Sequence, residues 1–295
     1  MKLGVSLPVF TADPSRPLGV AARAEELGFD GVFSPDHFFP PVFYPPAGPD
    51  RPALESFTTL AAASALHPAL HVGTLVARVT MRAPGLLAKQ AAALDQISQG
   101  KAILALGTGD AASKPEHAMY GFPYPPASDR VALLEETVSA LRALFGGGAW
   151  AGGTHVPPLT GPVLPAGSPQ LWVGGRSDAV LGVAARVADA WNGWGDDVPG
   201  FVAKAGRLRE LADGRAVVPT WGGIALVGED AADLERLLAA RAGKGMSTEG
   251  VWTGTGAELR SFVDGLGEAG AAWFVVLPVG PVDRLDVIAA ALIGR

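Results

Sequence analysis

Short apolar runs alternate with helical segments along the whole chain, and this alternation narrows the folds that the chain can adopt. Eight runs have the length and flanking residues of buried strands, and a segment with apolar residues at helical spacing follows each of them. Strands that alternate with helices in this way form parallel sheets. The predicted strands are 3–7, 31–34, 70–76, 102–106, 171–173, 188–192, 217–227 and 272–277.

The number and order of these units predict a single α/β domain over residues 1–295, a TIM (β/α)8 barrel. Such a barrel typically takes about 250 residues, so the chain has room for long loops at the carboxyl ends of the strands. A doubly wound open sheet is the structural alternative. No Gly-x-Gly-x-x-Gly pattern follows the first strand, which argues against a dinucleotide-binding domain. The predicted helices are 18–27, 54–66, 84–97, 129–145, 178–187, 198–211, 231–242, 257–269 and 285–293.

The composition argues against several classes of function. A net charge of −6 offers no basic surface for nucleic acid. The absence of Cys excludes disulfides, Cys-ligated zinc, iron–sulfur clusters and thiol nucleophiles, and the histidines show no metal-ligand spacing. Every apolar stretch falls short of the roughly 18 residues that a membrane span needs. No signal peptide is apparent, so we expect a cytoplasmic protein without a membrane partner.

Two long segments have neither helical nor strand periodicity. The segment 35–52 follows the second strand and is rich in proline, so it is neither a helix nor a central strand. Its length is greater than a plain connection needs, which predicts a functional loop. The segment 146–168 is rich in glycine and proline, and we interpret it as an excursion and a candidate lid.

The first candidate site residues are Asp36 and His37, just past the second predicted strand. The carboxyl ends of parallel strands share one face, where the functional groups of such folds lie. His is the side chain most easily tuned to exchange protons near neutral pH, and a neighbouring carboxylate can fix its tautomer. An Asp turn residue beside a surface His explains the pair equally well.

A glycine-rich turn, Gly107-Thr108-Gly109-Asp110, follows the fourth predicted strand. Its two glycines would let a flat ligand approach the backbone closely. The alternative is an ordinary turn in which Asp110 caps the next segment. On these four residues alone, the turn is the favoured interpretation.

A second turn, Gly174-Gly175-Arg176-Ser177, joins the fifth predicted strand to a helix. Backbone N–H groups at a helix start, together with Ser and Arg side chains, form an anion site. Phosphate binding is therefore the leading interpretation. The alternative is a tight turn in which Ser177 or Asp178 serves as the N-cap.

Two tryptophans, Trp191 and Trp194, lie at the end of the sixth predicted strand. Aromatic rings at a barrel mouth can wall a flat cofactor. They can equally well cover the top of the barrel, and this structural role is somewhat favoured for each ring taken singly.

Taken together, these residues resemble the bacterial luciferase-like family of flavin- and deazaflavin-dependent oxidoreductases. The family has the TIM-barrel fold, and its members bind FMN or the deazaflavin coenzyme F420 at the barrel mouth. The likeness covers nearly the whole chain in order and is carried by the segments 3–8, 24–32, 36–38, 73–109 and 169–192.

The resemblance implies a role for each group of residues. Asp36 and His37 are expected near the cofactor ring, with Gly73 and Thr74 behind it and the turn 174–177 on the phosphate. It also adds Trp191 to the expected cofactor-binding residues and implies a homodimer.

Two features bear on the branch of the family and on the substrate. The turn 107–110 looks most like the F420-dependent branch, where an acidic residue follows Gly-Thr-Gly. That branch often carries a Trp shortly after the Asp-His pair, whereas this chain has Phe39-Pro40-Pro41 there. Near the eighth strand, the sequence has few candidates for a clamp on a substrate phosphate beyond Arg284. Both points argue against a sugar-phosphate substrate.

We therefore expect an F420-dependent oxidoreductase that transfers a hydride between the coenzyme and a small organic substrate. His37 is the expected acid or base, Asp36 orients it, and Asp110 is a second proton carrier or an anchor for the ring. The alternative is an FMN-dependent monooxygenase that receives reduced flavin from a partner reductase. A barrel that binds flavin without catalysis is a third possibility.

Overall fold

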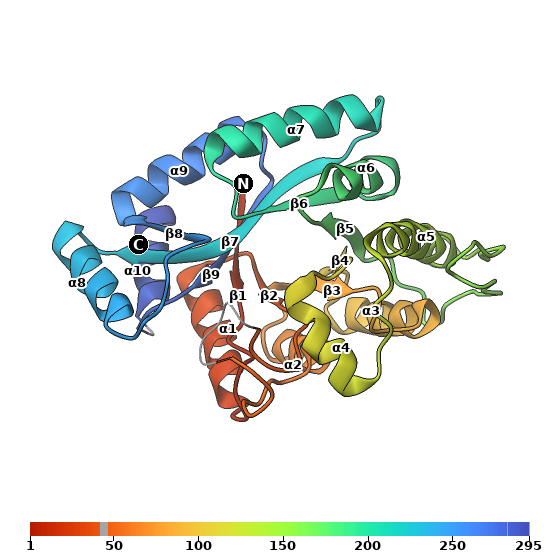
Figure 1. Ribbon diagram of the computed structural model, residues 1–295, viewed down its shortest axis with the longest axis horizontal. Helices are drawn as coiled ribbons and strands as arrows, with labels where there is room; N and C mark the ends of the chain where they lie inside the picture. Colours follow the sequence, from red (N-terminus) through yellow and green to blue (C-terminus); the bar gives the residue numbers. More distant parts are fainter. Residues whose placement is uncertain (42–46, 282, 295) are drawn as a thin grey trace.

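The computed structural model describes residues 1–41, 47–281 and 283–294, and it shows a closed parallel barrel with helices around it (Figure 1). Neighbouring strands of the ring are parallel, and the β1–β9 and β6–β7 pairings complete the closure. The predicted TIM barrel and its eight predicted strands are confirmed. The ring consists of β1 (Lys2–Ser6), β2 (Gly31–Ser34), β3 (His71–Arg78), β4 (Ala102–Gly107), β5 (Gln170–Gly174), β6 (Ala190–Trp194), β7 (Val218–Gly228) and β9 (Trp273–Pro278).

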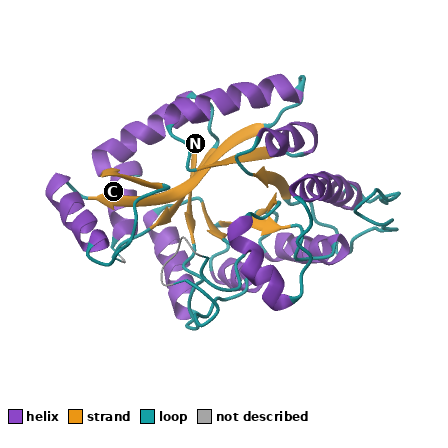
Figure 2. Cartoon of the chain, viewed as in Figure 1, coloured by secondary structure: helices purple, strands orange, loops and turns teal. Residues whose placement is uncertain are grey.

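The helices form the outer layer around the strands (Figure 2). Local signals fix several of their ends. For example, Gly28 closes α1 in the left-handed conformation, and Thr255 and Glu258 form a capping box at the start of α9. No helix in the described ranges is long and apolar enough to cross a membrane. The outer helices are α1 (Ser15–Leu27), α2 (Ser56–Leu66), α3 (Pro84–Ile97), α5 (Ala127–Phe145), α6 (Asp178–Val187), α7 (Val198–Ala212), α8 (Ala231–Ala242), α9 (Gly256–Glu268) and α10 (Arg284–Leu292).

Three short elements are absent from the sequence prediction. The one-turn helix η1 (Ala111–Ser113) and helix α4 (Lys114–Tyr120) lie between β4 and α5, in a segment predicted to be a loop. The strand β8 (Val251–Thr255) pairs with β7 from Ile224 onward, beyond the point where β6 ends. Periodicity gave too little signal over five or seven residues to reveal these elements.

Aromatic and aliphatic side chains fill the barrel, so it is a packed core rather than a pore. The ring of Phe33 lies between two strand glycines, and a Cβ atom at Gly4 or Gly73 would come within 2.6 or 2.7 Å of it. Both glycines are therefore required by the packing of Phe33. The interior cluster consists of Phe33, Leu75, Ile103, Ala105, Trp172, Ala190, Trp273 and Val275.

The excursion 146–168 lies outside the barrel against α3 and α5 (Figure 1). The Lys89 ammonium donates to the carbonyl of Leu164, and the N–H of Ser168 donates to the Asp95 carboxylate at 2.9 Å. This segment joins the end of α5 to the start of β5, so it belongs to the face where strands begin. The lid interpretation is wrong, because a lid would have to lie at the opposite face.

Candidate functional site

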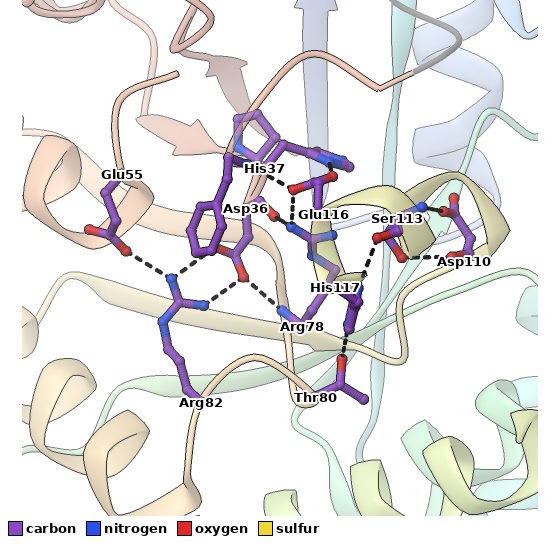
Figure 3. Close-up of polar contacts among 12 residues, drawn as sticks. Asp36, His37, Glu55, Arg78, Thr80, Arg82, Asp110, Ser113, Glu116 and His117 are labelled. Atoms are coloured by element: carbon purple, nitrogen blue, oxygen red, sulfur yellow. Dashed lines mark hydrogen bonds and ion pairs between the residues drawn. The ribbon is translucent and has the colours of Figure 1, made fainter. Parts of the chain in front are cut away.

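Asp36 lies just past the end of β2, where two arginines surround its carboxylate (Figure 3). The Arg82 guanidinium makes a two-pronged ion pair with it, at 2.6 Å to Oδ2 and 2.9 Å to Oδ1. The backbone N–H of Arg78 also donates to Oδ2, at 3.0 Å. Asp36 is only 2% exposed, so this ion pair is inside the protein. It connects the loop after β2 to the end of β3.

Charge compensation keeps Asp36 ionised despite its burial. Burial opposes ionisation, but the positive charges of Arg82 and Arg78 outweigh it, so the pKa of the Asp36 carboxyl is lowered. Burial alone would lower the pKa of Arg82, yet the charge of Asp36 raises it. Arg82 also bonds to Glu55 at 2.8 Å. The ionised Asp36 therefore anchors the loop after β2 to the arginines at the end of β3.

His37 is held by Glu116, which projects from α4. Its Nδ1 atom lies 2.6 Å from Oε1 of Glu116, a side chain with 0% exposure. The other oxygen of Glu116 accepts hydrogen bonds from the N–H of Phe38 at 2.8 Å and from Arg78 at 2.7 Å. Glu116 thus binds the loop after β2 and the end of β3 to α4 (Figure 3).

The state of Glu116 fixes the tautomer of His37. Burial raises the pKa of the Glu116 carboxyl. The hydrogen bonds from His37 and Arg78 have the larger, opposite effect and lower this pKa to about 2. An ionised carboxylate only accepts, so Nδ1 of His37 carries the hydrogen. Any proton exchange at His37 would therefore take place at Nε2.

The expectation that Asp36 orients His37 is wrong. The Asp36 carboxylate bonds to Arg82 and to the Arg78 N–H, while Nδ1 of His37 bonds to Glu116. Glu116 is not among the predicted site residues, because it lies in a segment predicted to be a loop. A signal was present, because Ser113 stands three residues before Glu116 in capping-box spacing and Gly121 follows as a helix end.

Further contacts fix α4 beside the loops that carry Asp36 and His37. The buried His117 donates from Nδ1 to the Ser113 carbonyl at 2.8 Å, and its Nε2 accepts from the Thr80 hydroxyl at 2.8 Å. The Phe38 ring packs edge-on against Tyr120, with centroids 4.8 Å apart. The position of Glu116 is therefore set by packing and hydrogen bonds from two loops.

Asp110 caps the one-turn helix η1 at the end of β4. Its Oδ1 accepts from the N–H of Ser113 at 3.2 Å, and its carbonyl accepts from the Ser113 hydroxyl at 2.6 Å. Asp110 is exposed, and Thr108 and Gly109 are half-buried. Gly109 has a φ of +70°, which favours glycine. The turn interpretation accounts for the conformation of these residues.

The glycines that end β4 and β5 make room for one side chain. A Cβ atom at Gly107 or at Gly174 would come within 2.6 Å of Val76. Here the pairing of β3 with β4 shifts register, between Thr74 and Ala77. The side chain of Val76 therefore occupies the space over both glycines, and it remains half-buried. Gly107 and Gly174 shape the top of the barrel through Val76.

The two residues expected behind the ring are buried. Thr74 is 0% exposed, and its hydroxyl donates to the Ala105 carbonyl at 2.8 Å. Gly73 is buried against Phe33. A ligand at the mouth would therefore meet Val76, the half-buried residue above them, rather than Gly73 or Thr74.

The turn 174–177 positions the start of α6. The N–H of Gly175 donates to the Asn192 carbonyl at 3.2 Å, and the Ser177 hydroxyl accepts from the N–H of Val180 at 3.3 Å. Ser177 is therefore the N-cap, as the turn interpretation predicts. Arg176 and Ser177 are both exposed beside the first turn, whose N–H groups lack partners within the helix. This arrangement suits an anion.

Trp191 does not lie at the barrel mouth, so the expectation that it contacts a cofactor is wrong. It is 0% exposed, and its ring stacks on Phe201 of α7 at a centroid distance of 5.9 Å. Its indole N–H donates to the Gly175 carbonyl at 3.0 Å, so it supports the turn before α6 from the outer layer. Trp194 is only half-buried and packs on the interior cluster.

Comparisons with known proteins identify relatives over nearly the whole chain. A model of the luciferase-like monooxygenase family matches residues 1–281. An F420-dependent glucose-6-phosphate dehydrogenase from Beutenbergia cavernae is 28% identical over 218 residues, 72% of this chain and 59% of that protein. The same-named protein from Intrasporangium calvum is 33% identical over 146 residues, 49% and 42% of the two chains. The chain thus covers less than two thirds of either relative.

Solved structures share the fold at low sequence identity. An F420-dependent secondary alcohol dehydrogenase, solved with an F420-acetone adduct, has a TM-score of 0.80 and 18% identity, covering 98% of this chain and 97% of its own. The EDTA monooxygenase of Chelativorans sp. BNC1 has a TM-score of 0.80 and 16% identity, covering 100% and 94%. At this level of identity, the comparison supports the barrel fold alone.

Proposed function

The chain belongs to the luciferase-like monooxygenase family, and on that basis we propose that it is an oxidoreductase that uses coenzyme F420. It transfers a hydride between the coenzyme and a small organic substrate. Two observations favour F420 over FMN. The two relatives described above are named F420-dependent dehydrogenases, and the turn 107–110 has the Gly-Thr-Gly-acid pattern of that branch. The alternative, an FMN-dependent monooxygenase with a partner reductase, is supported by neighbours such as the EDTA monooxygenase.

The residues at the barrel mouth fit a phosphate-bearing ring cofactor. The exposed Arg176 and the N-terminal turn of α6 would hold the phosphate. Val76, Thr108 and Gly109 are only half-buried and would lie along the ring. Bound F420 supplies a ring carbon that accepts or releases hydride.

The pairing of His37 with Glu116 is the observation that carries the proposed chemistry. Hydride transfer between an alcohol and a carbonyl also moves one proton at the substrate oxygen. His37 donates or accepts this proton at Nε2, because Glu116 holds the hydrogen at Nδ1. Glu116 is a positioning residue, and Asp110 is a second candidate proton carrier because it is exposed at the end of β4.

The charge distribution favours an uncharged substrate. A clamp on a substrate phosphate needs a cation whose charge is not already balanced, and neither Arg82, beside Asp36, nor Arg284 offers one. Arg82 is paired with Asp36 and Glu55. The clamp expected from Arg284 is also engaged, because it pairs with Asp283 at 2.9 Å and with Asp233. We therefore propose a secondary alcohol, ketone or enone as substrate.

A turnover screen tests this function. The protein is incubated with oxidised F420 and a panel of secondary alcohols, or with reduced F420 and a panel of ketones and enones. The absorbance of the coenzyme should change only when protein and a substrate of one panel are both present. Turnover with reduced FMN and oxygen, and none with F420, would favour the monooxygenase alternative. Cofactor binding without turnover on a broad panel would favour a non-catalytic barrel.

A further inference from the structure

A hollow of about 500 Å³ lies where η1 and α4 meet the start of α5. Two cationic side chains line it, Lys114 and Arg130, together with the ring of Tyr124. The rest of its wall is formed by two prolines and two alanines. No carboxylate lines this hollow in the described ranges of the chain.

Neither cation has an ion-pair partner within the part of the chain that the structure describes. The carboxylate of Glu116, two residues after Lys114, bonds to His37 and Arg78 instead. Lys114 is exposed, with Nζ 5.4 Å from the centroid of the Tyr124 ring. Arg130 is only 9% exposed and lies over the same ring at 4.2 Å. It donates from Nη1 to the Pro125 carbonyl at 2.7 Å, while its buried Nε has no hydrogen-bond partner there.

The hollow is level with the start of α6, the proposed phosphate site. An ion pair between Glu135 and Arg186, at 2.7 Å, holds α5 and α6 side by side. Glu135 lies eight residues after Ala127, the first residue of α5, and Arg186 lies eight residues after Asp178, the first residue of α6. The two helix starts are therefore level, and packed helices have axes about 8–10 Å apart.

We propose that this hollow receives the anionic oligoglutamyl tail of coenzyme F420. The inference rests on the proposed function. Beyond its phosphate, F420 continues as a lactyl group and a chain of γ-linked glutamates, each with a free carboxylate, whereas FMN ends at its phosphate. An extended α-linked chain gains roughly 3.3–3.6 Å per residue, and a γ-linked glutamate has two more carbons in the chain, so a few such units span the gap. Lys114 and Arg130 pair with the carboxylates, and Tyr124 packs on the methylene groups.

The test compares three ligands by fluorescence titration. They are the tailless deazaflavin alcohol, F420 without glutamates, and F420 with a long oligoglutamyl tail. An exposed ion pair typically contributes about 0.2–1 kcal/mol, so we expect the tailed form to bind about twofold to fivefold more tightly than the glutamate-free form. This difference should shrink at high ionic strength.

Substitutions test whether the side chains of the hollow cause this difference in affinity. Lys114→Glu should abolish or reverse the preference for the tailed form, while the affinity for the glutamate-free form changes much less. Lys244→Glu makes the same charge change at an exposed position after α8, on the other side of the barrel (Figure 1), and should preserve the preference. Arg130→Gln should also reduce it, with a melting curve to confirm folding because Arg130 is buried.

The outcomes separate this inference from the proposed function. Equal affinity for tailed and glutamate-free F420 in the parent protein would overturn the tail site. A preference that survives Lys114→Glu would overturn it as well, because the tail would then bind elsewhere. Failure of every deazaflavin form to bind would contradict the proposed function itself.

Discussion

Nδ1 of His37 lies 2.6 Å from the buried Oε1 of Glu116, across 79 positions of the sequence. This contact links the loop after β2 to a short helix that the barrel fold does not require. Since the carboxylate is ionised, it fixes which ring nitrogen can exchange a proton. The proposed catalytic geometry therefore depends on α4 as much as on the barrel.

His37→Ala should reduce turnover by about 10²–10⁴-fold, because a positioned general acid or base typically contributes that much. Cofactor affinity should change much less, since the proposed phosphate site is on α6. Steady-state kinetics and a binding titration measure the two effects separately. His155→Ala, at an exposed position in the excursion, is the matched control and should leave turnover unchanged. A His37 variant that keeps most of its kcat would make Asp110 the next candidate.

Glu116→Gln should make the free energy of unfolding less dependent on pH in the acid range. The folded state lowers the pKa of Glu116 from its ordinary 4.5 to about 2. The stabilisation from this charge is thus fully present above about pH 4.5 and is lost as the pH falls toward 2. Urea unfolding from pH 7 to pH 2.5 should show the parent more stable at neutral pH, by about 1–3 kcal/mol, and the gap closing in acid. A gap that is independent of pH would contradict this assignment.

Arg82→Met should destabilise the fold strongly. Removing one partner of a buried ion pair typically costs about 3–5 kcal/mol, because Asp36 would then be buried without its main counter-charge. Arg207→Met is the control, since the Arg207 pair with Glu210 is exposed and of little consequence. Denaturant unfolding of both variants measures the difference. Equal, small losses would mean that Asp36 is solvated or protonated in the folded protein.

Arg176→Ala should weaken the binding of phosphate-bearing cofactors and leave the tailless deazaflavin alcohol unaffected. Arg176 is exposed, so its removal should not disturb the fold. Gly175 is less suitable for this test, because its φ is +157° and an added Cβ would come within 2.8 Å of Val180. Equal weakening of both ligands would place the phosphate away from α6.

The sequence predicted the barrel because each strand and outer helix has its own periodic pattern. It predicted less of the site, since ion pairs join residues that no local pattern connects. Asp36 and His37 are neighbours in sequence, yet one bonds to Arg82 and the other to Glu116. Trp191 illustrates the same limit of prediction from local sequence patterns. Periodicity placed it at a strand end, but whether its ring faces the mouth or the helices depends on the strand register.

The most direct test of the account is a comparison of cofactor affinities. Purified protein is titrated separately with F420 and with FMN, and the dissociation constants are obtained from fluorescence. We expect F420 to bind at least tenfold more tightly, a difference of about 1.4 kcal/mol. Equal or tighter binding of FMN would contradict the proposal that this chain is an F420-dependent oxidoreductase.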